Sequence, residues 1–117
     1  MPNWWMASLW ERDPVLLISW IVWVVLSIVL HELAHGWTAI RCGDRTPIET
    51  GHMTLNPLVH IPPVAILMFV FTGITWGLMP VSPHRFQGRY DDAKVSFAGP
   101  TMNILLAIIC LRAIAAW

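Results

Sequence analysis

Three long apolar segments divide the chain, and polar connectors separate them. The first segment, Val15–Leu30, contains no charged residue, and neither does the second, Pro62–Pro80. The third segment, Ser96–Trp117, carries a single charge at Arg112. Because a helix needs about 20 mostly apolar residues to cross a bilayer, the pattern predicts an all-α membrane protein. We expect two or three transmembrane or re-entrant helices.

The first apolar segment begins with a helix-start signal. Asp13 is a favourable N-cap residue, and Pro14 fits the first helical position, where its missing N–H is not needed. We expect this helix to run from about residue 14 to residue 40 and to stop at Gly43. At 1.5 Å per residue it would be roughly 40 Å long, which is enough to cross a bilayer.

The second and third segments leave the topology open. Residues 62–80 are near the lower length limit for a span, so they either cross the membrane or enter it and return on the same side. In the re-entrant arrangement both connectors share one face, which carries five basic residues against two on the other face. This asymmetry fits cytoplasmic connectors under the positive-inside rule and slightly favours re-entry. A third helix is expected over about residues 96–117.

The first connector has turn-forming composition. Thr46–Leu55 is expected to be a short extended or hairpin segment around Gly51, and Asn56-Pro57 indicates a turn. No internal repeat or low-complexity tract divides the chain. We therefore expect residues 1–117 to form one integral-membrane domain.

Composition agrees with a membrane location. The chain is 56% hydrophobic and 12% charged, whereas a soluble domain carries about 25% charged residues. Eight tryptophans fit a protein with two membrane–water interfaces; Trp4, Trp5 and Trp10 lie either at headgroup level or on a frayed terminus. The formal net charge is zero. We expect a multi-pass protein of the cell membrane that contacts the lipid bilayer and binds no nucleic acid.

The most informative motif lies at the end of the first apolar segment. His31-Glu32-Leu33-Ala34-His35 matches the H-E-x-x-H pattern of zinc proteases. Ionisable side chains at membrane depth are costly, which favours a functional site. On a helix, His31 and His35 share one face, so both imidazoles can reach one Zn²⁺ ion. Glu32 suits a general base for metal-activated water. The weaker alternative is a polar cluster with satisfied hydrogen bonds and no metal.

Four motifs carry a resemblance to a known family. They are His31-Glu32-Leu33-Ala34-His35-Gly36, Gly51-His52-Met53-Thr54-Leu55-Asn56-Pro57-Leu58-Val59-His60, Pro80-Val81-Ser82-Pro83 and Ala98-Gly99-Pro100 followed by Asn103. With these motifs the chain resembles, from about Val22 to Ala107, the site-2 protease family of intramembrane zinc metalloproteases. The likeness is greatest to its short bacterial branch.

The resemblance implies both a cofactor and a reaction. It implies Zn²⁺ held by His31 and His35, with Glu32 as the catalytic acid and base, and it implies transmembrane protein substrates. It also places the stretch Thr54–Asn56 beside the active site, where substrate backbone would pair with it as an added strand. For Gly99 and Asn103 we expect only structural roles, in close helix packing and in a hydrogen bond to a neighbouring helix.

The chain departs from the family pattern at the third zinc ligand. A catalytic zinc has three protein ligands and an open position, and family members take the third from an aspartate on a following helix. The chain ends at Trp117 before such a helix, so the third ligand is left open, and an aspartate beyond Trp117 is one candidate. His60 is a weak candidate and Cys42 a weaker one. A hydrogen-bonding residue at a turn is the simpler interpretation of His60.

Three functions therefore compete. The leading one is a zinc-dependent intramembrane endopeptidase. The second is a catalytically incomplete fragment or pseudoprotease scaffold, because a third ligand is not evident. A metal transporter or haem-binding subunit ranks lowest, since the later segments offer only Thr72, Thr75 and Asn103 as polar partners. Because three short segments bury little surface, we also expect other partners or a homo-oligomer.

Overall fold

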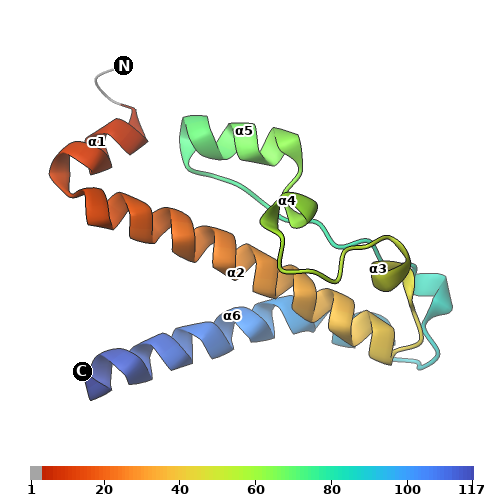
Figure 1. The fold of residues 1–117 in the computed structure, drawn as a ribbon. Coiled ribbons are helices and arrows are strands. Elements are labelled where there is room, and N and C mark those ends of the chain that lie inside the picture. Colours follow the sequence, from red (N-terminus) through yellow and green to blue (C-terminus); the bar gives the residue numbers. More distant parts are fainter. Residues whose placement is uncertain (1–3) are drawn as a thin grey trace.

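Figure 1 shows the computed structural model of the protein, which describes residues 4–117. This part of the chain is helical and contains no strand, which confirms the predicted all-α class. The elements are α1 (Trp5–Arg12), α2 (Pro14–Arg41), α3 (Thr46–Glu49), α4 (Pro57–His60), α5 (Pro63–Thr72), the 3-10 helix η1 (Pro83–Arg85) and α6 (Asp91–Ala116).

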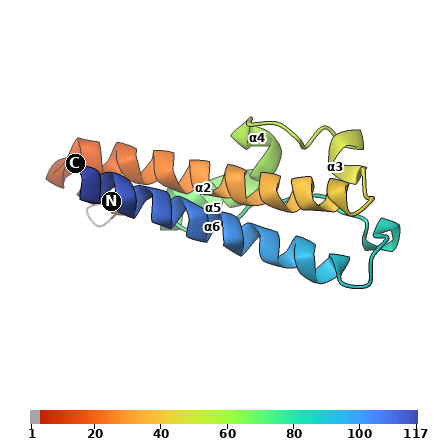
Figure 2. The same cartoon turned by 90° about the horizontal axis from the view of Figure 1, so that it is seen from below.

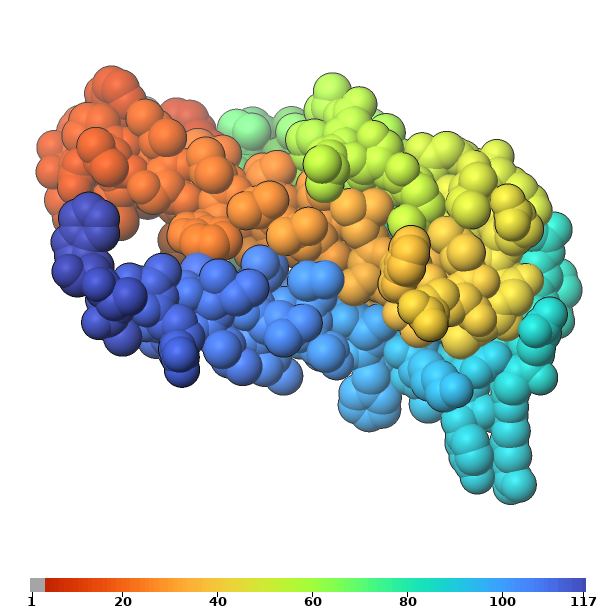
Figure 3. Space-filling view, turned by 60° about the horizontal axis from the view of Figure 1, so that its bottom comes forward, coloured from red at the N-terminus to blue at the C-terminus, as the bar shows by residue number. Residues whose placement is uncertain are grey.

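The two long helices, α2 and α6, form the body of the structure. Figures 1 and 2 agree that the C-terminal part of α2 packs along the N-terminal part of α6. There, Ala39, Cys42 and Val95 form a buried apolar cluster. The helices separate toward the start of α2 and the end of α6 (Figure 1), and Figure 3 shows a gap between them at that end.

Local sequence determines both ends of α2. The Asp13 carboxylate accepts a 3.0 Å hydrogen bond from Val15 N, and Pro14 occupies the first turn, so the helix starts where the sequence predicts. After the last turn Gly43 has a φ of 102°, in the left-handed region that favours glycine. Asp13 N also donates to Leu9 O at 2.8 Å, so α1 and α2 meet at a tight turn.

Both long helices have the length and apolarity to cross a membrane. With 28 and 26 residues, they are roughly 42 and 39 Å long at 1.5 Å per residue, against about 30 Å for the hydrocarbon layer. Only 11% and 6% of their most apolar stretches are buried. A helix in the core of a soluble protein is mostly buried, so these exposed apolar faces fit contact with lipid.

The second apolar segment does not form a spanning helix. The ten residues of α5 extend only about 15 Å, and Gly73 ends the helix with a φ of 81°. Residues 74–82 then return without helix or strand, and we call them the returning segment. Its Leu78 N donates to His60 O at 2.8 Å. The segment thus comes back to the end where it began, which is the geometry of the re-entrant alternative.

The N-terminal tryptophans tie the start of the chain to α5. The indole N–H groups of Trp4 and Trp5 donate to Val70 O at 2.7 and 3.2 Å. The Trp5 ring also packs edge-on against Phe69, with centroids 5.4 Å apart. These bonds satisfy a carbonyl near the end of α5 that lacks a helical partner. For Trp4 and Trp5, the structure therefore favours an ordered contact over a frayed terminus.

A buried carboxylate joins the two connectors. Asp44 is fully buried, and it accepts hydrogen bonds from the N–H and hydroxyl of Thr46 and from the N–H of Ser82. Arg85 Nη1 lies 3.8 Å from Asp44 and forms a 2.9 Å ion pair with Glu49. Because Thr46 follows α2 and Ser82 precedes α6, this cluster holds the ends of the two long helices together.

The segment Thr46–Leu55, which we expected to be extended or a hairpin, is helical in its first half. Thr46–Glu49 forms α3, because Pro47 lies in its first turn with a φ already suited to a helix. The turn at Gly51 is present, with a φ of 73°.

The expected start of the third helix is also different. α6 begins at Asp91 rather than near Ser96, since the carboxylates of Asp91 and Asp92 are favourable in the first turn of a helix. Pro100 lies inside the helix. There it removes one backbone hydrogen bond.

The contacts of Asp44 make stability depend on pH. Burial alone raises the pKa of Asp44, but hydrogen bonds from Thr46 and Ser82, helped by the charge of Arg85, outweigh it and hold the pKa below its ordinary value. The folded protein therefore binds this proton less tightly than the unfolded chain. The stabilisation is complete above the ordinary pKa of about 4 and is lost as pH falls through the lowered folded-state pKa.

We predict that Asp44→Asn lowers the free energy of unfolding by about 1–3 kcal/mol at neutral pH, because an amide N–H replaces an acceptor that faces a buried donor. Thermal unfolding in detergent, followed by tryptophan fluorescence, measures this change. Below about pH 4 the variant should lose less further stability than the wild type. Glu11→Gln changes an exposed carboxyl and serves as the control. Equal acid sensitivity in Asp44→Asn and wild type would refute the assignment.

Candidate metal centre

His31 and His35 lie one turn apart on α2, and their rings meet edge to face. The centroids are 4.7 Å apart with an interplanar angle of 78°, and the two Nε2 atoms face each other at 3.1 Å. Residues i and i+4 share a helix face, which produces this arrangement. The structure therefore brings together the two nitrogens that the sequence predicts as metal ligands.

α6 contacts both rings. His35 Nδ1 donates to the carbonyl of Val95 at 2.6 Å, and Asn103 Nδ2 lies 3.0 Å from His31 Nδ1. Each Nδ1 thus faces α6, and each Nε2 faces the other histidine. Contacts of this kind orient a metal-binding histidine and determine which ring nitrogen carries the proton.

Gly99 leaves room for the two rings. It lies on α6 between Val95 and Asn103, at the same four-residue spacing. A Cβ atom at this position would lie 2.5 Å from Nε2 of His31 and would overlap Nε2 of His35. Real Cβ atoms do not come this close to other atoms. The missing side chain therefore leaves a space, which we call the Gly99 space, bounded by the two Nε2 atoms.

Glu32 is buried next to the histidines, beneath the returning segment. Its side chain is 8% exposed. A Cβ atom on Gly77 would lie 2.7 Å from Glu32 Cγ and 2.8 Å from its Oε1. The backbone of the returning segment therefore passes directly over the carboxylate, and glycine permits this approach.

A cavity of about 310 Å³ lies against His31 and Glu32. It is lined by Ser27, Ile28, His31, Glu32, Trp76, Gly77 and Asn103. Leu55, from the stretch that the resemblance places beside the active site, instead lines a separate apolar pocket with Val25 and Val29. The structure thus puts the returning segment, rather than Leu55, at the cavity.

Two observations indicate that His31 and His35 are placed to hold a zinc ion. Zinc binds imidazole nitrogen at about 2.0–2.1 Å in tetrahedral geometry, so two nitrogen ligands of one ion lie roughly 3.3 Å apart. The Nε2–Nε2 distance of 3.1 Å is close to that value. The Gly99 space provides a volume that touches both Nε2 atoms. Neutral imidazole is also a ligand that zinc prefers.

The described residues supply no complete ligand set. Within residues 4–117, no group of three or more His, Cys, Asp or Glu side chains is placed to hold a metal ion. His60 is fully buried and its Nε2 donates to Thr54 O at 2.6 Å, which agrees with a local hydrogen-bonding role. For Cys42, burial raises the pKa of the thiol and a hydrogen bond to Asp91 adds to the effect. The thiol therefore stays protonated and is a poor ligand.

The sequence predicts the histidines and Glu32 as site residues, a packing role for Gly99 and a hydrogen bond from Asn103 to a neighbouring helix. The expected bond from Asn103 to a neighbouring helix is present, and its partner is His31. The signal that identifies these residues is the spacing of Val95, Gly99 and Asn103, which puts all three on one face of a helix.

Comparison with known proteins gives several relatives. The chain is 35% identical over 91 residues to "Putative zinc metalloprotease YwhC" of Bacillus subtilis, a match covering 76% of this chain and 42% of that protein. It is 34% identical over 94 residues to "Putative zinc metalloprotease Rip2" of Mycolicibacterium smegmatis, covering 74% and 36%. It is 35% identical over 97 residues to Rip2 of Mycobacterium tuberculosis, covering 78% and 37%.

These matches cover only part of each relative. The chain spans about two fifths of the length of the curated proteins that it matches. No family model matches the chain, and no solved structure matches it.

We predict that Gly99→Ala weakens zinc binding, because the new methyl group occupies the Gly99 space. The expected loss of affinity is about 10–100-fold, the range typical of changes around metal ligands. Alanine normally stabilises a helix relative to glycine by roughly 0.5–1 kcal/mol, so weakened α6 would not explain the loss. Zinc titration against a chelator in detergent, with helicity checked by circular dichroism, measures the effect.

Thr101→Ala is the matched control for Gly99→Ala. Thr101 is exposed on α6, and its hydroxyl bonds only within the helix, to Phe97 O. This variant should bind zinc as the wild type does. Wild-type affinity in Gly99→Ala would show that the Gly99 space is not where the ion binds.

Proposed function

We propose that the protein acts as a zinc-dependent intramembrane endopeptidase of the site-2 protease type on transmembrane protein substrates. The observation that carries the proposal is the facing pair of Nε2 atoms of His31 and His35 beside buried Glu32. Similarity to relatives named as zinc metalloproteases supports the metal and the reaction class. Because a catalytic zinc has three protein ligands, the proposal requires one more ligand than residues 4–117 provide.

His31, His35 and Glu32 divide the roles in peptide hydrolysis. His31 and His35 would hold the zinc ion through Nε2. When bound, zinc supplies Lewis-acid polarisation of the scissile carbonyl and makes water more acidic. Glu32 takes a proton from the attacking water and delivers it to the leaving amine, as a general base and then a general acid. Gly77 covers Glu32, which limits access of bulk water to the carboxylate.

The position of the site along α2 places it near one membrane surface. His31 lies about 26 Å along the helix from Pro14 at 1.5 Å per residue, and the hydrocarbon layer is about 30 Å thick. If α2 spans from Pro14, His31 lies just inside the surface that faces the connectors, and His35, about 6 Å further along the helix, lies at that surface. We therefore propose a multi-pass protein of the cell membrane that cuts substrates close to this surface.

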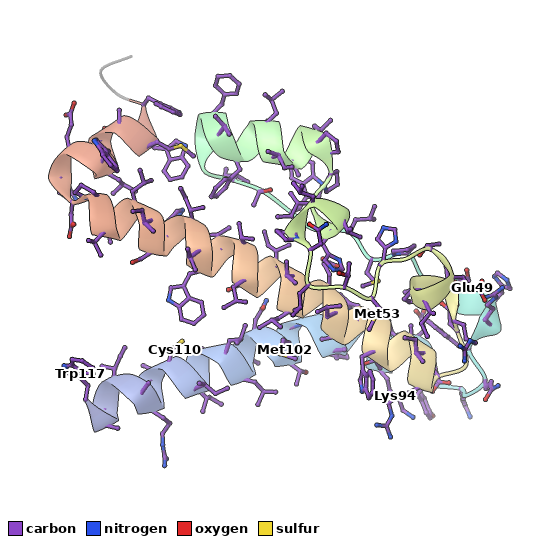
Figure 4. All side chains as sticks on the ribbon, viewed as in Figure 1. Glu49, Met53, Lys94, Met102, Cys110 and Trp117 are labelled. Atoms are coloured by element: carbon purple, nitrogen blue, oxygen red, sulfur yellow. The ribbon has the colours of Figure 1, made fainter. Side chains whose placement is uncertain are left out.

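An apolar groove between α2 and α6 suits an apolar substrate segment. Its volume is about 610 Å³, and its walls come mainly from α2 and α6. Met53, Lys94 and Met102, which are labelled in Figure 4, line it, and so does Ala34, the neighbour of His35. An apolar stretch of substrate in this groove would lie along the two helices that carry the histidines and Gly99.

The test of the proposed function is Glu32→Gln. We expect this variant to retain zinc, because glutamine leaves both imidazoles in place. It should cleave about 10²–10⁴-fold more slowly, because the general base is lost. Metal analysis of the purified protein gives the zinc content, and proteoliposomes holding single-span membrane proteins give the cleavage rate. Glu11→Gln, which changes an exposed carboxyl, should leave both unchanged.

The other outcomes separate the alternatives. Cleavage by Glu32→Gln at the wild-type rate would remove the assigned role of Glu32. Stoichiometric zinc in the wild type without cleavage of any tested membrane protein would favour the non-catalytic scaffold, which the incomplete ligand set motivates. Absence of zinc binding would contradict the metal centre itself.

A further inference from the structure

We propose that the apolar groove between α2 and α6 selects substrates by charge, and that Lys94 and Arg41 at its connector end recognise acidic residues flanking the apolar stretch of the substrate. This inference rests on the proposed function. It adds a class of substrate, namely apolar segments with an acidic flank on the side of the connectors, and two residues that determine specificity.

The groove runs from the middle of the two long helices toward the connectors. Leu30 and Leu105 line its inner part, and Trp37 and Lys94 line it nearer the connectors. Figure 4 shows Lys94 near the end where the connectors lie and Met102 further along α6. Lys94 is roughly 16 Å from Leu105 along α6 at 1.5 Å per residue, which is the length of about five residues of extended chain. A short apolar stretch therefore fits between the inner part and the charged end.

Arg41 provides a second positive charge at the connector end. On α2, Leu30, Ala34 and Trp37 line the groove, and their spacing of three or four residues puts them on one face of the helix. Arg41 continues this spacing one turn after Trp37. It is exposed, and within residues 4–117 no acidic side chain forms an ion pair with it. Its guanidinium group is therefore available to a carboxylate, which it can bind through two parallel hydrogen bonds.

Lys94 is only weakly engaged within the protein. Its Nζ lies 3.5 Å from Asp91 Oδ1, and its side chain is 66% exposed. An exposed pair of this kind contributes little, and Asp91 Oδ2 already accepts a 2.6 Å hydrogen bond from Gly88 N. Asp92 lies two residues before Lys94 and so on a different face of α6. The end of the groove therefore carries two cations against one buried carboxylate.

The walls of the groove favour a peptide over a lipid. Met53 and Met102, labelled in Figure 4, line it from the first connector and from α6. Methionine side chains are flexible and adapt to surfaces of different shape, which suits substrates whose side chains vary, whereas acyl chains are uniform. An acidic flank meets opposite charges at Lys94 and Arg41, and a basic flank meets like charges. The groove thus discriminates by repulsion as well as by attraction.

Binding of synthetic membrane peptides tests the charge selection. The probe is a fluorescent peptide with one apolar segment that ends in two aspartates, and matched peptides end in two asparagines or two lysines. Fluorescence anisotropy in zwitterionic detergent measures their binding to Glu32→Gln, which prevents cleavage during the measurement. We expect the aspartate peptide to bind about 3–10-fold more tightly than the asparagine peptide, and the lysine peptide to bind least. This preference should shrink between about 0.1 and 1 M salt, where the Debye length falls from roughly 10 to 3 Å.

Variants of the two cations assign the preference to residues. Lys94→Gln and Arg41→Gln should each reduce the preference for the aspartate peptide, and the double variant should remove it. Lys94→Glu combined with Arg41→Glu should reverse it, so that the lysine peptide binds best. Arg112→Gln removes an exposed positive charge near the other end of α6 and is the matched control, which should keep the wild-type preference. Circular dichroism checks that every variant retains its helicity.

The outcomes separate this inference from its alternatives. Equal binding of the three peptides, or a preference that survives in the double glutamine variant, would overturn it. Displacement of the asparagine peptide by phosphatidylglycerol from the protein with both cations, but not from the double glutamine variant, would assign the groove to an anionic lipid and would also overturn it. With active protein, kcat/KM should follow the same order of peptides. The expected charge preference in binding without any cleavage would contradict the proposed function and support the charge selection.

Discussion

The arrangement depends on the close approach of α6 to two imidazole rings on α2. Two histidines on successive turns can share one ion only if nothing fills the space between their Nε2 atoms. Gly99 meets this requirement, because any Cβ there would overlap the rings. The same approach brings Val95 O and the Asn103 amide within hydrogen-bond distance of the two Nδ1 atoms. The packing of α6 against α2 therefore determines both the contact between the helices and the positions of the two imidazole rings.

Surrounding elements support that contact from two sides. The Asp44 cluster joins the connectors at the end where α2 and α6 pack together. The returning segment covers Glu32 at Gly77. Polar groups within an apolar chain are costly unless they are partnered, and all four ring nitrogens of His31 and His35 have partners. The site thus concentrates its polar groups where other elements can satisfy them.

The sequence predicts the parts of this structure that depend on local pattern. Apolar runs predict the two long helices, Asp13-Pro14 predicts where α2 starts, and the four-residue spacing predicts that His31 and His35 share a face. The parts it misses depend on register between distant segments. Asn103 is 72 residues from His31, and only the offset of α6 along α2 makes them partners. α6 starts at Asp91, upstream of the apolar run that predicted a start near Ser96, because the favourable carboxylates of its first turn lie in the polar connector.

The account is tested most directly by zinc K-edge X-ray absorption spectroscopy of the zinc-loaded wild type and His35→Ala. Two histidine nitrogens at about 2.0–2.1 Å from zinc are expected in the wild type, and one is expected in the variant. A wild-type spectrum without imidazole scattering, or an identical spectrum in His35→Ala, would contradict a shared metal site on α2.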